Sequence, residues 1–293
     1  MVASAARPVA ALVVNAFVWG VSWWPLRQLE ARGLHPLWAT VIVYALSAAA
    51  LVAARPRAPA RLADTPALWV LVLASGSTNA AFNWAVVAGD VVRVVLLFYL
   101  MPLWAVLLAR LLLGERLTRR AAARVLLALG GAALVLWPDA TGAASGPRLA
   151  DVLGLAGGFA FALNNVMLRR LAAHDGAERA FAMFAGGVLV SGGIGALLGA
   201  HGTLPWPPAP APGWVAGAAG LAVLFLLSNL ALQYGAARLP ANVTAVVMLC
   251  EVVFASASAL ALGAGTLSAP LAAGAALIVA AALLSTLEPR AAH

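Results

Sequence analysis

The sequence predicts an all-α membrane protein of ten transmembrane helices, arranged as two inverted five-helix repeats. Apolar residues make up 64% of the 293 residues, charged residues only 10%, and the mean hydropathy is +0.97. A soluble domain carries about 25% charged residues, so the outer surface of this chain is expected to face lipid. In addition, residues of the first half of the chain recur in order in the second half.

Ten apolar runs are long enough to cross a membrane. A helix rises about 1.5 Å per residue, so about 20 residues span a hydrocarbon core about 30 Å thick. Lipid cannot satisfy open backbone groups, and the runs are too long for barrel strands, so each is predicted to be a helix. The runs are approximately 8–28, 36–54, 66–88, 92–113, 120–138, 149–170, 179–199, 213–236, 240–262 and 269–287.

The basic residues predict the orientation. All eighteen are arginines. If the N-terminus is cytoplasmic, only Arg27, Arg32, Arg93 and Arg148 lie outside, and the other fourteen lie inside. The positive-inside rule therefore predicts that both the N and C termini are cytoplasmic. Because the arginines form short clusters between apolar runs, the net charge of +8 indicates orientation in a lipid bilayer, and we expect no nucleic-acid partner.

The internal repeat predicts two units, residues 1–140 and 149–290. The matched pairs are Trp19 with Phe161 and Ser22 with Asn164 (both displaced by 142), Asn79 with Asn229 and Asn83 with Gln233 (both by 150), and Gly131 with Gly274 (by 143). Five is an odd number of helices, so the second unit enters the membrane from the opposite side. Such inverted repeats are typical of secondary transporters, whose substrate site lies near the midplane between the repeats.

Polar side chains within the spanning runs are candidates for lining that site, because they are costly in lipid unless they face a cavity or each other. Amides both donate and accept hydrogen bonds, so they suit a zwitterionic substrate without placing a net charge in the membrane. The same amides could equally bond between helices, and the sequence leaves both interpretations open. The candidates are Ser22, Asn79, Asn83, Asn164, Asn229 and Gln233, with Asn15 on the same stripe as Trp19.

Aromatic residues deep in the runs are candidates for a stacking wall. The candidates are Trp19, Trp23, Phe98, Tyr99 and Phe161, whereas tryptophans near the run ends fit the interfacial belt.

Three further residues interrupt the apolar pattern. Glu251 is the only acidic residue clearly within a spanning run, and intramembrane carboxyl groups mark proton pathways, so it is a possible proton-coupling residue. Pro25 and Pro102 are candidates for a helix kink or gate, because proline frees a backbone carbonyl and bends a helix. Asp90 and Arg93, three residues apart, are expected to form a local ion pair or a helix cap.

Several segments resemble the EamA family of the drug/metabolite transporter (DMT) superfamily. They are Tyr99-Leu-Met-Pro102-Leu-Trp, then Leu113-Gly114-Glu115-Arg116-Leu117-Thr118, and the glycine-rich run after them. The second copy is degraded, with Glu251 where Pro102 stands in the first. Within the superfamily, Trp19-Gly20-Val21-Ser22-Trp23 resembles the YddG-type aromatic amino acid exporters. The resemblance implies export of aromatic and other neutral amino acids and methyl viologen-like compounds.

Other function classes receive less support. The four histidines fall in loops or at the end of the chain, no metal-ligand spacing is present, and no Walker sequence occurs, so we expect neither an enzyme nor a cofactor. Nucleotide sugars or sugar phosphates would call for buried basic residues. A channel-like facilitator, or an exporter of other metabolites or drugs, remains an alternative. We expect the bacterial cytoplasmic (inner) membrane as the location, and a monomer is compatible with the sequence.

Overall fold

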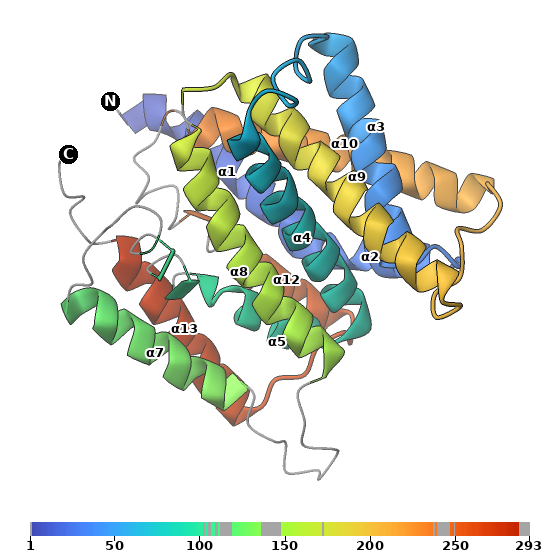
Figure 1. Cartoon of the computed structure of the whole chain (residues 1–293). Coiled ribbons are helices and arrows are strands. Elements are labelled where there is room, and N and C mark those ends of the chain that lie inside the picture. Colours follow the sequence, from blue (N-terminus) through green and yellow to red (C-terminus); the bar gives the residue numbers. More distant parts are fainter. Residues whose placement is uncertain are drawn as a thin grey trace.

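A computed structural model describes residues 2–101, 103–104, 107–108, 111, 119–135, 148–171, 173–236, 238, 247–248 and 250–286. Within these residues all regular structure is helical (Figure 1). The helices of the first half are α1 (Val2–Val21), α2 (Trp23–Glu30), α3 (Pro36–Ala54), α4 (Pro66–Ala88), α5 (Val91–Phe98) and α7 (Arg119–Val135). Those of the second half are α8 (Leu149–Arg170), α9 (Gly176–Ala200), α10 (Pro212–Ala236), α12 (Cys250–Ala261) and α13 (Ala269–Thr286).

Local sequence fixes where several helices begin. Prolines occupy the first positions of α3 and α4, where the missing N–H costs nothing. Asp90 caps α5 by accepting a hydrogen bond from the Arg93 N–H at 3.0 Å, and Asp175 caps α9 by accepting from the Ala177 N–H at 3.0 Å. Asp90 is therefore a helix cap, one of the two alternatives expected for it.

Two predicted helices are shorter or broken in the structure. The run 8–28 is divided at Ser22, four residues after Val18 and three before Pro25. Pro25 has no N–H to bond Val21, and its ring crowds that carbonyl, which gives a physical reason for a break just before it. The run 92–113 is helical as α5 to Phe98 and then turns at Tyr99 and Leu100.

Helix α4 lies at the centre of the bundle, where it packs against α3, α5, α8 and α9 (Figure 1). Within the part of the chain that the structure describes, six helical segments are long and apolar enough to cross a membrane: Ala6–Glu30 (α1 and α2 together), Pro36–Ala54, Pro66–Ala88, Leu149–Leu168, Gly176–Ala200 and Pro212–Leu232. The outer faces of the surrounding helices are apolar, with Leu189 and Leu197 of α9 and Val223 of α10 all more than half exposed. The exposed surface of this multi-pass helical bundle therefore carries apolar side chains, which are compatible with contact with lipid.

Packing between the two halves comes in related pairs. Helix α4 of the first half packs on α8 and α9 of the second, and α10 of the second half packs in the same way on α1 and α3 of the first. Likewise, the contact of α1 with α12 is related to the contact of α8 with α5. Other contacts between the halves join α3 with α9, α5 with α12, α7 with α13, α2 with α10, and α5 with α13. Figure 1 shows α7 and α13 side by side at one edge, where they contact the rest of the described bundle through α5.

Candidate functional site: a central aromatic cavity

A cavity lies between the two halves, in the middle of the bundle. Its empty volume, including its open mouth, is about 790 Å³. Helices from both halves supply the wall. The lining residues are Asn15, Trp19, Tyr44, Ser75, Thr78, Asn79, Phe82, Phe98, Phe161, Asn164, Met183, Phe184, Phe225, Asn229, Leu232, Met248 and Glu251.

The aromatic lining forms one continuous series of seven rings. Ring centroids are 5.3 Å apart for Phe161–Phe98, 4.8 Å for Phe98–Phe82, 6.2 Å for Phe82–Trp19, 4.6 Å for Trp19–Phe225, 6.0 Å for Phe225–Tyr44 and 5.8 Å for Tyr44–Phe184. Each separation suits edge-to-face or offset stacking. We call this series the aromatic wall. It gives the cavity a surface for a flat apolar group.

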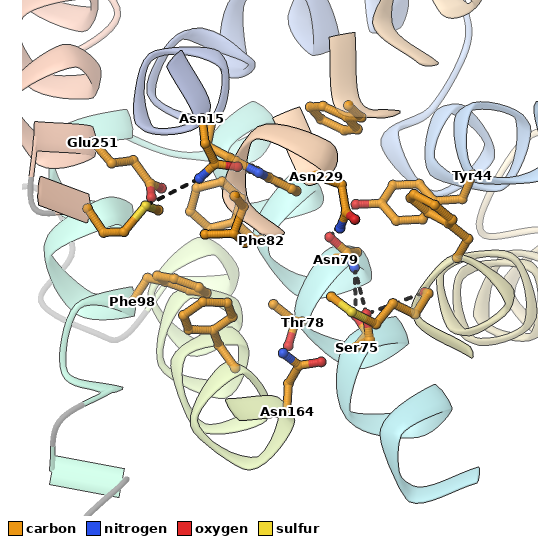
Figure 2. A pocket seen from close by; sticks show the side chains of 17 residues that line it. Asn15, Tyr44, Ser75, Thr78, Asn79, Phe82, Phe98, Asn164, Asn229 and Glu251 are labelled. Atoms are coloured by element: carbon orange, nitrogen blue, oxygen red, sulfur yellow. Dashed lines mark hydrogen bonds between the residues drawn. The ribbon is translucent and has the colours of Figure 1, made fainter. Parts of the chain in front are cut away.

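Asn79 organises one side of the cavity, as Figure 2 shows. Its side-chain oxygen accepts a hydrogen bond from the Tyr44 hydroxyl, and its Nδ2 donates to the Ser75 carbonyl at 2.8 Å. Asn229 lies close by on this side. Asn79 therefore combines both roles that the sequence left open: it faces the cavity and it bonds α4 to α3.

Asn15 organises another side. It accepts a hydrogen bond from the Ser228 hydroxyl at 2.8 Å and donates to the Met248 sulfur at 3.3 Å. Its side chain thereby links α1 to α10 and to the residues before α12. Asn164, by contrast, has a buried side-chain oxygen with no hydrogen-bond partner among the described residues. Figure 2 shows its amide beside Thr78.

Glu251 is the only charged-type side chain among the lining residues. It is 7% exposed, and its Oε2 accepts a hydrogen bond from the Tyr99 hydroxyl at 3.0 Å. Tyr99 itself is 2% exposed and lies behind the lining, so it positions the carboxyl group and does not face the cavity.

Two glycines let helices come close enough to place these groups. A Cβ on Gly20 of α1 would lie 2.9 Å from the Glu251 carbonyl oxygen of α12, and one on Gly158 of α8 would lie 2.5 Å from the Phe98 carbonyl oxygen of α5. Neither position admits a larger residue without moving backbone. These close approaches bring Glu251 and Phe98 to the cavity from the two related helix pairs, α1–α12 and α8–α5.

The structure brings seven of the predicted site residues to this cavity: Trp19, Asn79, Phe98, Phe161, Asn164, Asn229 and Glu251. Four others lie elsewhere. Ser22 donates to the Trp19 carbonyl at 2.8 Å, Trp23 donates to the Ser258 hydroxyl at 2.9 Å, and Asn83 donates to the Thr40 hydroxyl at 3.0 Å. Tyr99 contacts Glu251 from behind. Pro102 and the Gln233 side chain lie outside the described residues.

Several lining residues were not predicted from the sequence. Some of them could have been found from their helix face and from the internal repeat. Ser75 and Phe82 share a helix face with Asn79. Their positions 150 residues later are Phe225 and Leu232, and all four line the cavity. The repeat that matched Asn79 with Asn229 could have found them. Tyr44, Met183 and Phe184 carried no such signal.

Polar contacts join the two halves at one end of the bundle, which we call the Arg93 end: α2 and α4 end there, and α5, α8 and α10 begin there. Arg93 donates to both carboxylate oxygens of Asp151, at 2.7 and 3.0 Å, and Asp90 accepts from the Thr266 N–H at 2.8 Å. Both contacts join the two halves. Arg27 donates to the carbonyls of Val86 and Gly89, which end α4.

The lining residues of the second half lie far from the Arg93 end. Phe161 is twelve residues beyond Leu149, Phe225 is thirteen beyond Pro212, and Phe184 precedes Ala200 by sixteen. At 1.5 Å per residue these offsets amount to about 18 to 24 Å. The cavity therefore lies nearer the opposite end of these three helices.

Comparison with known proteins agrees with this architecture. The model of the EamA-like transporter family matches residues 7–137. This segment is EamA-like. The match covers less than half of the chain and lies within the first predicted repeat.

A solved crystal structure of a protein covers 96% of this chain and 97% of its own length, with a TM-score of 0.58 and 21% identity. At that identity the likeness shows the fold alone, but it extends across both halves. The comparison with curated proteins gives no match.

Proposed function

We propose that this EamA-like protein is a secondary exporter of small metabolites, including aromatic and other neutral amino acids and methyl viologen-like compounds, by alternating access around the central cavity. The observation that carries the proposal is the aromatic wall, seven rings in series drawn from both halves. Such a wall suits an aromatic side chain, and the amides around it replace water lost by the polar part of a substrate.

The pairing of helix contacts supports an inverted repeat of two five-helix units and ten spanning helices. Exchange of α4 with α10, α1 with α8, α3 with α9, and α5 with α12 turns the α4–α8, α4–α9 and α1–α12 contacts into the observed contacts α10–α1, α10–α3 and α8–α5. Ser75, Asn79 and Phe82 of α4 correspond to Phe225, Asn229 and Leu232 of α10, each displaced by 150 and each lining the cavity. A repeat of this kind lets the site open to either membrane face in turn.

The contacts that join the halves at the Arg93 end support the same mechanism. With the predicted orientation in the bacterial inner membrane, this end faces outward and the cavity lies nearer the cytoplasm, as an exporter requires when it loads. Glu251 lies on the cavity wall, where a carboxyl group that couples transport to protons would need to be.

Counterflow into liposomes tests the proposal. Liposomes with purified protein and loaded with unlabelled L-phenylalanine should accumulate labelled L-phenylalanine transiently and with saturation, because a carrier exchanges bound substrate. Phe161→Ala should raise the half-saturation concentration about tenfold, because it removes one end of the aromatic wall. A channel-like facilitator gives no counterflow, and that result would refute the carrier.

Phe159→Ala is the matched control on the same helix. Phe159 is 41% exposed, contacts Trp104 at a centroid distance of 5.6 Å, and does not line the cavity. Its removal should leave the half-saturation concentration unchanged. Equal effects of the two substitutions would mean that the aromatic wall does not hold the substrate.

A further inference from the structure

Resting on the proposed function, we infer that the cavity selects aromatic compounds by a positive charge, with Glu251 as the counter-ion, so that it takes aromatic amines in preference to the corresponding amino acids. The zwitterion expected from the sequence brings an equal number of positive and negative charges. The described lining of the cavity, by contrast, contains an acidic side chain and no basic one.

The charge of the lining has one sign. Glu251 is the only Asp, Glu, Lys, Arg or His among the seventeen lining residues. Its Oε2 accepts the Tyr99 hydrogen bond, while its Oε1 has no hydrogen-bond partner among the described residues. An ammonium group supplies three donors and a compensating charge, so it fits this oxygen. Tyr99 and the neighbouring Cys250 are the other titratable groups beside it on α5 and α12.

A carboxylate has no comparable partner in the lining. The Asn79 amide already donates to Ser75, the Asn15 amide to Met248, and the Thr78 hydroxyl to the Ala74 carbonyl at 2.8 Å. No basic side chain is present among the described residues of the lining. A substrate carboxylate would therefore lose its water without a positive charge in return, which is costly in an apolar site.

The aromatic wall adds to the preference for a cation. Trp19, Phe82 and Phe98 lie in the same cavity as Glu251, and Figure 2 shows Phe82 and Phe98 on the side of the cavity where the carboxyl group lies. The faces of aromatic rings attract cations electrostatically, most strongly where water is excluded. A carboxyl group bordered by aromatic faces is thus complementary to an amine with an aromatic ring attached.

Binding of three ligands with the same ring tests the inference. We would measure binding of trimethyl(2-phenylethyl)ammonium, L-phenylalanine and 3-phenylpropionate to the purified full-length protein by isothermal titration calorimetry. The quaternary ammonium keeps its charge at every pH. We expect it to bind at least tenfold more tightly than L-phenylalanine, and 3-phenylpropionate to bind most weakly. An equal or reversed order in the wild-type protein would overturn the inference.

Substitutions then assign the charge to Glu251. Glu251→Gln keeps the size of the side chain and an acceptor for Tyr99, and it should weaken binding of the ammonium at least tenfold while changing that of 3-phenylpropionate little. Glu178→Gln is the matched control, because Glu178 pairs with His174 at 3.3 Å on α9 and does not line the cavity. Unchanged ammonium binding by Glu251→Gln would also overturn the inference.

The two proposals fail in different ways. Saturable counterflow of L-phenylalanine without preference for the ammonium leaves the exporter standing and removes the cation selectivity. Absence of counterflow for every aromatic compound removes the exporter itself.

Discussion

The two ends of the bundle hold the halves together by different means. At the Arg93 end, an ion pair and a capped loop cross from one half to the other: Arg93 to Asp151, and Asp90 to Thr266. At the opposite end, the polar contacts of Arg238 and of His174 stay within the second half, with Arg238 donating to the Tyr234 carbonyl at 3.1 Å. Of these contacts, those at the Arg93 end join the two halves.

This difference indicates which contacts must break for the cavity to open toward the Arg93 end. A carrier that alternates needs contacts between its halves that form in one state and are absent in the other. The Arg93–Asp151 pair meets this need, because Asp151 is nearly buried, with a 3% exposed side chain, and Arg93 is 21% exposed. Removing one partner leaves the other charge without compensation.

Asp151→Asn should have the largest effect on the access of reagents to the cavity from the Arg93 end, because it removes the charge that pairs with Arg93. A cysteine at Thr78, in a Cys250→Ser background, would report whether the cavity opens there. We expect an impermeant thiol reagent outside intact cells to label it roughly tenfold faster in the Asp151→Asn variant, a change of about 1.4 kcal/mol.

Asp175→Asn serves as the control, since Asp175 caps α9 at the opposite end and Asn is an equally good cap. It should leave the labelling rate unchanged. If Asp151→Asn labels no faster than this control, the ion pair does not keep that end closed.

Substitution of the glycines that bring helices together should have the next largest effect. Gly158→Ala and Gly20→Ala each force backbone apart, and overpacking of this kind costs about 1–3 kcal/mol. The midpoint of thermal unfolding in detergent should fall for both variants.

Gly220→Ala is the matched control, because a Cβ at Gly220 of α10 meets nothing within 4 Å. There, alanine should be neutral or stabilise the helix by up to about 1 kcal/mol. A fall as large as that of Gly158→Ala would mean that the loss reflects helix propensity or lipid contact, not close packing.

The smallest expected effect is a dependence of stability on pH through His35, which lies at the Arg93 end. His35 caps α3 by accepting from the Leu37 N–H at 3.2 Å, and burial lowers the pKa of His35. Its contribution to stability is therefore complete above the ordinary histidine pKa of about 6.5 and is lost as pH falls through its lowered pKa. Unfolding midpoints at pH 7.5 and 4.5 should differ by the loss of a cap, about 0.5–1 kcal/mol.

His35→Asn retains a cap acceptor that does not titrate. This variant should lose the part of the pH dependence that belongs to His35, while the remainder persists. An identical pH dependence in both proteins would assign the effect to other groups.

Much of the helical layout followed from hydropathy and proline. The predicted runs 36–54, 66–88 and 149–170 coincide with α3, α4 and α8, because flanking polar residues and N-terminal prolines mark those ends. The break at Ser22 did not follow from hydropathy, which is continuous through Val21 and Trp23. Packing and the Pro25 ring determine it, and apolar runs carry no information on either.

The site residues that could be predicted from the sequence are polar side chains within apolar, lipid-spanning runs. Asn79, Asn229 and Glu251 stand out in apolar helices, and all three line the cavity. Ser22 and Trp23 share their sequence neighbourhood with Trp19, yet the break at Ser22 turns them toward other partners. Asp151 could not be chosen as the partner of Arg93, since 58 residues separate them and only the fold brings them together.

The α7–α13 contact has a mechanical consequence. Gly131 and Gly274 meet there reciprocally, since a Cβ on either would lie within 2.8 Å of the carbonyl oxygen of the other. The buried side chains of Ile278 and Val135 pack beside the two glycines, so an alanine at either position would force the two backbones apart. The first and second halves are thus also joined at a tightly packed crossing that lies away from the cavity lining.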